Sequence, residues 1–247
     1  KIEAKINLDK IVSRHLGILA MTGMGKSNLV SLITKKISEV KGTVIIFDYH
    51  NDYTTLNIPN VNVIDAKINP RLLEADQFSE VLEIRENADV QQRVLRMSFT
   101  QEVKEAGEFW NKLEYEVDLL VNSEDKKLKE IRTSAYRVQD IIEDAQRRFD
   151  DILDPEVGNP MDYIKEGCTN IINISELSEK QANVAMGFYL QQLLKDRKNA
   201  TIAKHGKSKK QKDYKFFEPV FIILEEAHVF IPKDHDTAAK YWAAKIA

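Results

Sequence analysis

The sequence predicts an α/β fold in which a mostly parallel sheet carries an inserted helical bundle. Towards both ends of the chain, short apolar runs rich in β-branched residues alternate with amphipathic stretches, a pattern typical of parallel strands with helical crossovers. The acidic middle of the chain instead has only helical periodicity. We therefore expect a core made of residues 1–71 and 166–247, with residues 72–165 as the inserted bundle.

The core elements follow from the apolar pattern of each segment. Residues 16–21 are expected to form the first strand, and residues 27–40 a helix, because their apolar side chains recur at helical spacing. Residues 43–48 are a continuous β-branched and aromatic run, which is typical of a strand buried on both faces. The remaining core elements are strands at residues 61–65, 169–175 and 219–225 and a helix of about twenty residues from Ser178 onward.

The inserted segment has two apolar stripes at helical spacing, separated by a break at Asn122 and Ser123. We expect two antiparallel helices packed face to face, with residues 77–99 also helical. Packing inside a bundle explains the stripes without any ligand site. The stripes comprise Trp110, Leu113, Val117, Leu120 and Val121 on the first helix and Leu128, Ile131, Ala135, Val138, Ile142, Ala145, Phe149 and Ile152 on the second.

Composition and charge exclude several classes of protein. The 247 residues are 43% hydrophobic and 30% charged, which is globular, and no apolar run approaches the roughly 18 residues of a spanning helix. The first ten residues lack the apolar region of a signal peptide, and a single cysteine, Cys168, can form no internal disulfide. A reducing, cytoplasmic location is therefore expected. The net charge of -3 is uneven, because residues 83–166 carry 21 acidic and 13 basic side chains.

Residues 20–27, Ala-Met-Thr-Gly-Met-Gly-Lys-Ser, fit the Walker A phosphate-binding loop, with Ala in the first position where Gly is more common. The glycines permit a loop whose N–H groups point inward, and the helix that begins near Ser27 adds its positive dipole end. Lys26 supplies a mobile cation, and the Ser27 hydroxyl can bind Mg²⁺. A tight glycine turn with an exposed lysine is the alternative. ATP and Mg²⁺ are the expected cofactors, and the residues expected to bind them are Thr22, Gly23, Met24, Gly25, Lys26, Ser27 and Asn28.

A Walker B strand is expected at residues 219–225, where an apolar run ends in Glu225 and Glu226. Ligands bind at the carboxyl ends of strands in such sheets. Glu225 takes the position of a more usual Asp and is expected to hold Mg²⁺ through a water, and Glu226 to act as general base on the attacking water. Lys26, Glu225 and Glu226 are thus the candidate catalytic residues, with Ser27 and Glu225 as metal ligands. Two adjacent solvent-exposed glutamates are the alternative.

Three segments together resemble the archaeal HerA proteins, which are hexameric DNA translocases or helicases of the HerA/FtsK class. They are the Walker A loop preceded by Arg14, the segment Ile-Ile-Phe-Asp-Tyr-His-Asn-Asp-Tyr at residues 45–53, and Leu-Glu-Glu-Ala-His at residues 224–228. The loop alone occurs in many unrelated NTPases, whereas the combination is specific, and the resemblance covers nearly the whole chain. Asn51 and Asp52 depart from the family's more usual Gly-Glu.

The resemblance implies a RecA-like P-loop core that uses ATP and Mg²⁺ to drive double-stranded DNA through a homo-hexameric ring. It also implies a NurA-type nuclease as partner and a role in DNA end resection during repair. The chain stops one helix after the Leu-Glu-Glu-Ala-His segment, so we expect an incomplete motor without its arginine finger. Two alternatives stay open. One is a related secretion or conjugation ATPase that moves protein or single-stranded DNA, and the other is a nucleotide-switched interaction module.

Other polar residues are weaker candidates. Arg14 could reach a nucleotide at a subunit junction or be an ordinary solvated arginine, and Asp48 could join the Mg²⁺ water shell or hold a loop. His228 follows the carboxylate pair and could be structural. The Asp-His-Asp run at residues 234–236 is a poor metal site, because adjacent residues rarely converge on one ion. The lysine-rich stretch from Lys204 to Lys215 could contact DNA phosphate or form a solvated surface loop.

Overall fold

A computed structural model describes residues 16–19, 24–55, 57, 60–85, 87–204, 215–233 and 237–246 of the chain. The chain divides into two compact units. The core unit comprises residues 1–66 and 161–247, and the helical unit comprises residues 67–160. In the part of the chain that the structure describes, no helix is long and apolar enough to cross a membrane.

The core unit contains a four-stranded, entirely parallel sheet in the order β2-β3-β1-β4. The register pairs Ile46 with Ile171 on one side and with Ile223 on the other. Because all strands run the same way, their carboxyl ends meet at one edge, where Asp48 and Glu225 lie. This confirms the predicted α/β class. The strands are β1 (Thr43–Asp48), β2 (Val61–Asp65), β3 (Thr169–Asn173) and β4 (Val220–Leu224).

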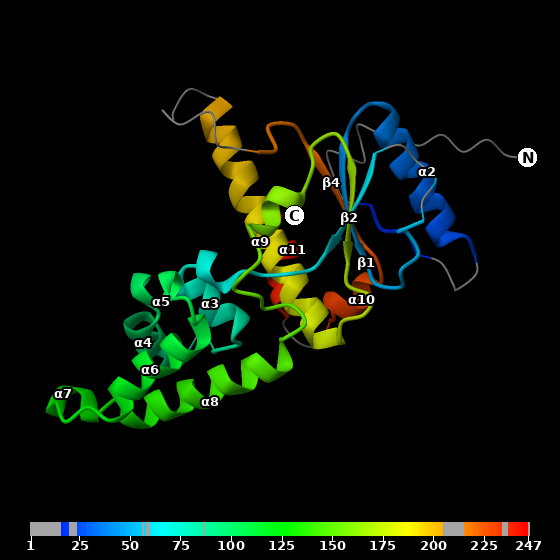
Figure 1. Ribbon diagram of the computed structural model, residues 1–247. Coiled ribbons are helices and arrows are strands. Elements are labelled where there is room, and N and C mark those ends of the chain that lie inside the picture. The colour runs from blue at the N-terminus through cyan, green and yellow to red at the C-terminus, as the bar shows by residue number, and fades with distance from the viewer. Residues whose placement is uncertain are drawn as a thin grey trace, which may run out of the picture. The chain divides into compact units, whose positions relative to one another are not determined.

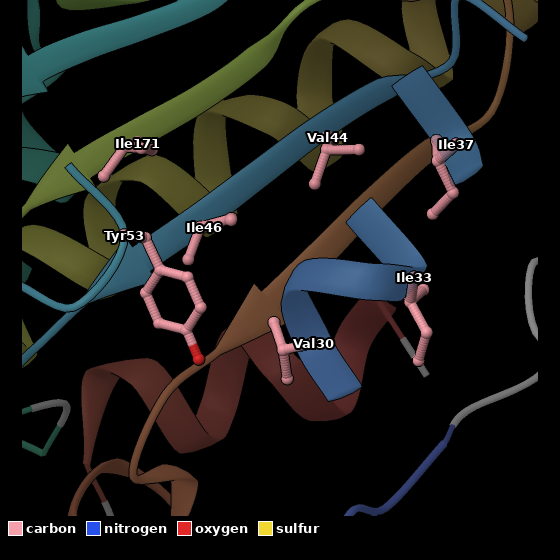
Figure 2. Close-up of a cluster of buried hydrophobic side chains, with 7 residues drawn as sticks. All are labelled: Val30, Ile33, Ile37, Val44, Ile46, Tyr53 and Ile171. Carbon is pink, nitrogen blue, oxygen red and sulfur yellow. The ribbon is translucent and has the colours of Figure 1, made fainter. Parts of the chain in front are cut away.

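Helices cover both faces of β1, so all six residues of this strand are buried. Alternate side chains of a strand point to opposite faces. Val44 and Ile46 pack against apolar side chains of α2 (Lys26–Glu39), as Figure 2 shows. On the opposite face, the Phe47 ring meets Tyr189 of α9 (Glu179–Lys204) edge to face, with centroids 6.3 Å apart. The sheet therefore lies between α2 on one side and α9 on the other (Figure 1).

The strand predicted at residues 16–21 is not observed in its described part. Residues 16–19 have no strand structure, and the Leu19 side chain is 97% exposed. A strand needs a neighbour that supplies ladder hydrogen bonds, and among the described residues none of the four strands pairs with this segment. Ala20 and Met21 lie outside the described residues.

The last helix of the chain, α11 (Ala238–Ile246), packs closely against α9. Gly187 on α9 lies directly beneath Ala238. A Cβ atom at position 187 would lie 2.7 Å from the Ala238 Cβ and 3.1 Å from its backbone carbonyl carbon. Asn183, one turn earlier on α9, accepts the Ala239 N–H at 3.2 Å through its side-chain oxygen. The short α10 (Ala227–Phe230) lies between β4 and α11 in the chain.

We predict that Gly187→Ala lowers the free energy of unfolding by about 1–2 kcal/mol, because overpacking costs about 1–3 kcal/mol. Helix propensity alone predicts the opposite sign, since Ala stabilises a helix interior by about 0.5–1 kcal/mol relative to Gly. Urea denaturation of the full-length protein measures the difference. Gly107→Ala is the control, because no atom lies within 4 Å of the added Cβ. Stabilisation by Gly187→Ala would contradict the close packing of these helices.

The helical unit is a bundle of short helices around the pair α6 (Phe109–Val121) and α8 (Arg132–Arg148). The two helices pack face to face, and the Gln146 side-chain amide of α8 donates to a Glu114 carboxylate oxygen of α6 at 2.5 Å. The segment predicted as helical at residues 77–99 forms two helices instead of one, with Glu83 between them in the left-handed region at φ 58°. The elements are η1 (Pro70–Leu72), α3 (Ala75–Val81), α4 (Asp89–Ser98), α5 (Gln101–Glu105), α6 (Phe109–Val121), α7 (Lys126–Lys129) and α8 (Arg132–Arg148).

The boundaries of the helical unit lie five residues before those expected from the sequence, at 67 and 160 instead of 72 and 165. Backbone hydrogen bonds join Ile68 to Ile152 and Asp154, which places the residues just before 72 in the helical unit. At the other end, the helical turn η2 (Pro160–Tyr163) leads back to the sheet, where the Asn62 side chain donates to the Tyr163 carbonyl at 2.7 Å.

Candidate nucleotide-binding site

The site begins at the amino terminus of α2, where the Walker A segment turns into the helix. Gly25 has φ 86°, a left-handed conformation that costs glycine little and other residues more, and it is the residue immediately before the helix. Its carbonyl accepts the Leu29 N–H at 3.0 Å, so the first turn is regular. The amino terminus of such a helix is a favourable place for an anion. Thr22 and Gly23, also predicted to bind nucleotide, lie outside the described residues.

Lys26 and Glu226, predicted from two motifs 200 residues apart, are in direct contact. The Lys26 Nζ donates to a Glu226 carboxylate oxygen at 2.5 Å. This hydrogen bond with Lys26 lowers the pKa of the Glu226 carboxyl, against a smaller opposing effect of burial. Glu226 is therefore ionised at neutral pH, which is the form that a general base requires.

Glu226 also has two histidines beside it. The His228 Nδ1 lies 3.2 Å from one of its oxygens, and the His50 Nε2 lies 3.8 Å from the other. The backbone of Glu226 is left-handed at φ 45°, a conformation that is uncommon for a residue with a Cβ atom. His228 was a weak candidate from sequence. His50 lies in the segment at residues 45–53 that carries the family resemblance, but the pattern does not show that it meets Glu226.

Glu225 makes different contacts from those expected of a metal ligand. It is buried, and its Oε2 atom accepts the backbone N–H groups of Tyr49 at 2.9 Å and His50 at 3.1 Å. Burial raises the pKa of the Glu225 carboxyl, and these two N–H groups oppose the rise. In this arrangement Glu225 fastens the turn that follows β1. Its expected contact with Mg²⁺ through a water stays a prediction.

Asp48, for which the sequence left two roles open, holds the same turn from β1. The carboxylate is fully buried, and it accepts the Asp52 N–H at 3.0 Å on one oxygen and the Tyr53 N–H at 2.9 Å on the other. Backbone amides that converge on a buried carboxylate satisfy its charge. Asp48 thus fixes a loop, which is one of its two expected roles.

The turn brings a further carboxylate to the predicted metal ligand. The Ser27 hydroxyl donates to an Asp52 carboxylate oxygen at 3.0 Å. The buried Tyr53 hydroxyl is hydrogen-bonded to the Ser27 side chain as well, and burial raises the pKa of Tyr53 to about 12. Figure 2 shows the Tyr53 ring lying between β1 and α2. Asn51 and Asp52 depart from the family's usual Gly-Glu, and the sequence pattern alone does not predict the contact of Asp52 with Ser27.

The described residues fit a phosphate-bound Mg²⁺ better than a metal caged by protein alone. Within the described ranges, no group of three or more His, Cys, Asp or Glu side chains is arranged to hold a metal ion. Mg²⁺ commonly keeps several waters and takes only one or two protein ligands together with substrate phosphates. The Ser27 hydroxyl, in the first turn of α2 and one residue after Lys26, suits that kind of binding.

Several weaker candidates fall outside the site or outside the described residues. Arg14, residues 234–236 and residues 205–214 are not described. The first and last residues of the lysine-rich stretch, Lys204 and Lys215, form ion pairs with acidic side chains within the core unit. Lys204 lies 3.0 Å from a Glu218 oxygen, and Lys215 lies 3.2 Å from an Asp162 oxygen.

A parallel sheet, a helix that begins at Gly-Lys-Ser and a carboxylate pair at the carboxyl end of β4 define a RecA-like P-loop NTPase core. The model of the family described as "Helicase HerA, central domain" matches residues 1–193. The chain belongs to the HerA family.

Three archaeal relatives support this assignment, each named DNA double-strand break repair helicase HerA. The protein of Sulfurisphaera tokodaii is 39% identical over 100% of this chain and 50% of its own length. That of Sulfolobus acidocaldarius is 36% identical over 100% of this chain and 50% of its own length. That of Saccharolobus solfataricus is 34% identical, with 100% and 49% covered. The chain thus spans about half the length of these relatives.

Proposed function

We propose that this chain is the ATP-hydrolysing core of a DNA repair helicase that translocates double-stranded DNA during end resection. The contact between Lys26 and Glu226 is the observation that carries the proposal. It supports the proposal because Lys26 of the phosphate loop and Glu226, the proposed proton acceptor just after β4, meet at one point, where a bound phosphate chain would be hydrolysed. The names of the relatives support a role in DNA repair.

In the proposed reaction, the first turn of α2 and the preceding loop bind the phosphates of ATP, and Lys26 moves from Glu226 to the phosphates. The released Glu226 carboxylate accepts a proton from water as the water oxygen bonds to the γ-phosphorus. The bond from that phosphorus to the bridging oxygen then breaks, and the leaving group is ADP. Ser27 would hold Mg²⁺ together with Glu225 through a water, and the bound ion would neutralise phosphate charge.

The proposed partners come from the family resemblance. They are double-stranded DNA, a NurA-type nuclease and further copies of the same protein in a homo-hexameric ring. The residues outside 83–166 are the more basic part of the chain, with 23 basic and 18 acidic side chains, which favours an anionic partner.

We predict that duplex DNA accelerates ATP hydrolysis by the full-length protein, because a translocase couples each turnover to movement along its substrate. The measurement is the steady-state ATPase rate with increasing amounts of a linear duplex at fixed salt, since phosphate contacts depend on salt. Single-stranded DNA of the same length and an unfolded protein substrate serve as comparisons. Indifference to duplex DNA together with stimulation by the protein substrate would instead favour a secretion ATPase.

A further inference from the structure

The turn between β1 and β2 is fastened by two buried carboxylates from adjacent strands. Glu225, at the end of β4, accepts the N–H groups of residues 49 and 50, and Asp48, at the end of β1, accepts those of residues 52 and 53. Asn51, in the middle, is left-handed at φ 60°. The backbone on both sides of position 51 is therefore held to the sheet, and the direction of the Asp52 side chain follows from it.

Asp52 differs from these two carboxylates because its side chain is exposed and does not anchor the turn. It accepts the Ser27 hydroxyl at 3.0 Å, and Ser27 is the second residue of α2. A typical hydrogen bond contributes only about 0.5–1.5 kcal/mol net to stability, because folding exchanges it for hydrogen bonds with water, and this one is exposed to water. Stability is thus a weak reason for a carboxylate at this position, whereas orientation of the hydroxyl is a strong one.

We propose that Asp52 is a positioning residue for the Mg²⁺ that accompanies ATP, acting through the Ser27 hydroxyl. When the hydroxyl proton points to Asp52, the Ser27 oxygen keeps two lone pairs, of which one faces the Tyr53 hydroxyl and the other is left for the cation. Partners of this kind orient a metal ligand and raise its basicity, and their loss commonly costs 10–100-fold in metal affinity. This inference rests on the proposed function and gives Asp52 a part in Mg²⁺ binding, whereas the sequence led us to expect only Ser27 and Glu225 as metal ligands.

The test is the affinity of the full-length protein for a fluorescent, non-hydrolysable ATP analogue, measured with Mg²⁺ and with EDTA. For Asp52→Asn we expect binding with Mg²⁺ to weaken about 10-fold and binding with EDTA to stay unchanged. The Asn side chain can turn its N–H groups to the Ser27 oxygen, so it no longer fixes the direction of the hydroxyl proton. Asp52→Glu, which keeps the carboxylate, should restore part of the Mg²⁺ effect. Asp65→Asn is the matched control, since Asp65 is an exposed aspartate at the carboxyl end of β2.

A double-mutant cycle with Ser27→Ala separates positioning from a general effect on the pocket. If Asp52 acts through Ser27, Asp52→Asn has no further effect on Mg²⁺-dependent binding in the Ser27→Ala background. Equal losses with Mg²⁺ and with EDTA, or no loss at all, would overturn the inference. If Asp52→Asn lowers the melting temperature, Asp52→Glu is the deciding variant. It should keep part of the Mg²⁺-dependent affinity, and a complete loss of that affinity while Asp65→Asn binds normally would refute the inference. Failure of the unmodified protein to bind the analogue would instead refute the proposed function.

Discussion

Glu226→Gln is expected to abolish ATP turnover while leaving ATP binding intact. Removal of a general base commonly slows a reaction about 100- to 10,000-fold, and an amide cannot accept the proton of the attacking water. Hydrogen bonding to Lys26 lowers the pKa of the Glu226 carboxyl, so the native side chain is in the basic form at neutral pH. The substitution changes only the charge and proton affinity of a side chain of the same shape.

Steady-state ATPase assays and equilibrium binding of a labelled ATP analogue to the full-length variant measure the two effects separately. Glu218→Gln is the matched control, because Glu218 lies two residues before β4 and its partner is Lys204 on the surface. It should leave turnover unchanged. Normal turnover by Glu226→Gln would show that another group removes the proton, and His228 and His50, which lie beside Glu226, would be the first to substitute.

Glu225 and Glu226 show how two identical neighbours acquire different roles. Successive residues leaving a strand point to different sides, and here the left-handed backbone of Glu226 separates them further. Glu225 turns inward to the backbone of the turn after β1, whereas Glu226 meets Lys26. Sequence patterns identified the pair correctly as the end of a strand, but only the folded backbone determines which oxygen faces which donor.

The parallel core could be predicted because its signal is local. The apolar run at Thr43–Asp48 is a strand buried on both faces, as its composition indicates, and the amphipathic pattern after Gly25 is α2. The strand expected at residues 16–21 was wrong for its described part, because an apolar run becomes a strand only beside a partner. Periodicity does not report whether that partner is present.

Features that depend on contacts between distant segments were beyond the sequence pattern. The boundary of the helical unit is set by hydrogen bonds between Ile68 and residues 84 or more positions later, which no local pattern encodes. The contact of Asp52 with Ser27 depends likewise on two carboxylates that hold the intervening turn. The motif at residues 45–53 indicated a functional segment at the carboxyl end of β1. The structure adds that Asp52 in this segment contacts Ser27.

Lys26→Ala is expected to have the other large effect, a loss of both ATP binding and turnover. Removal of one preorganised donor that stabilises developing charge at an active site costs about 100- to 1,000-fold in rate, and we expect a loss of this order here. The ammonium also holds Glu226, so the pKa of that carboxyl should return towards its ordinary value once its largest perturbing partner is gone. Because that carboxyl stays ionised at neutral pH, turnover should fall through the loss of the phosphate-binding cation, whereas Glu226→Gln removes only the proton acceptor.

The two variants therefore differ in one measurement, the affinity for the ATP analogue, which Lys26→Ala should weaken and Glu226→Gln should not. Lys36→Ala on the same helix is the control, because Lys36 is exposed and pairs only over a short range with Glu39. ATP hydrolysis at the native rate by Lys26→Ala would refute the Walker A assignment. Native binding with slow turnover would instead limit Lys26 to the reaction step, since the phosphates would then be held by the backbone of the loop and α2 alone.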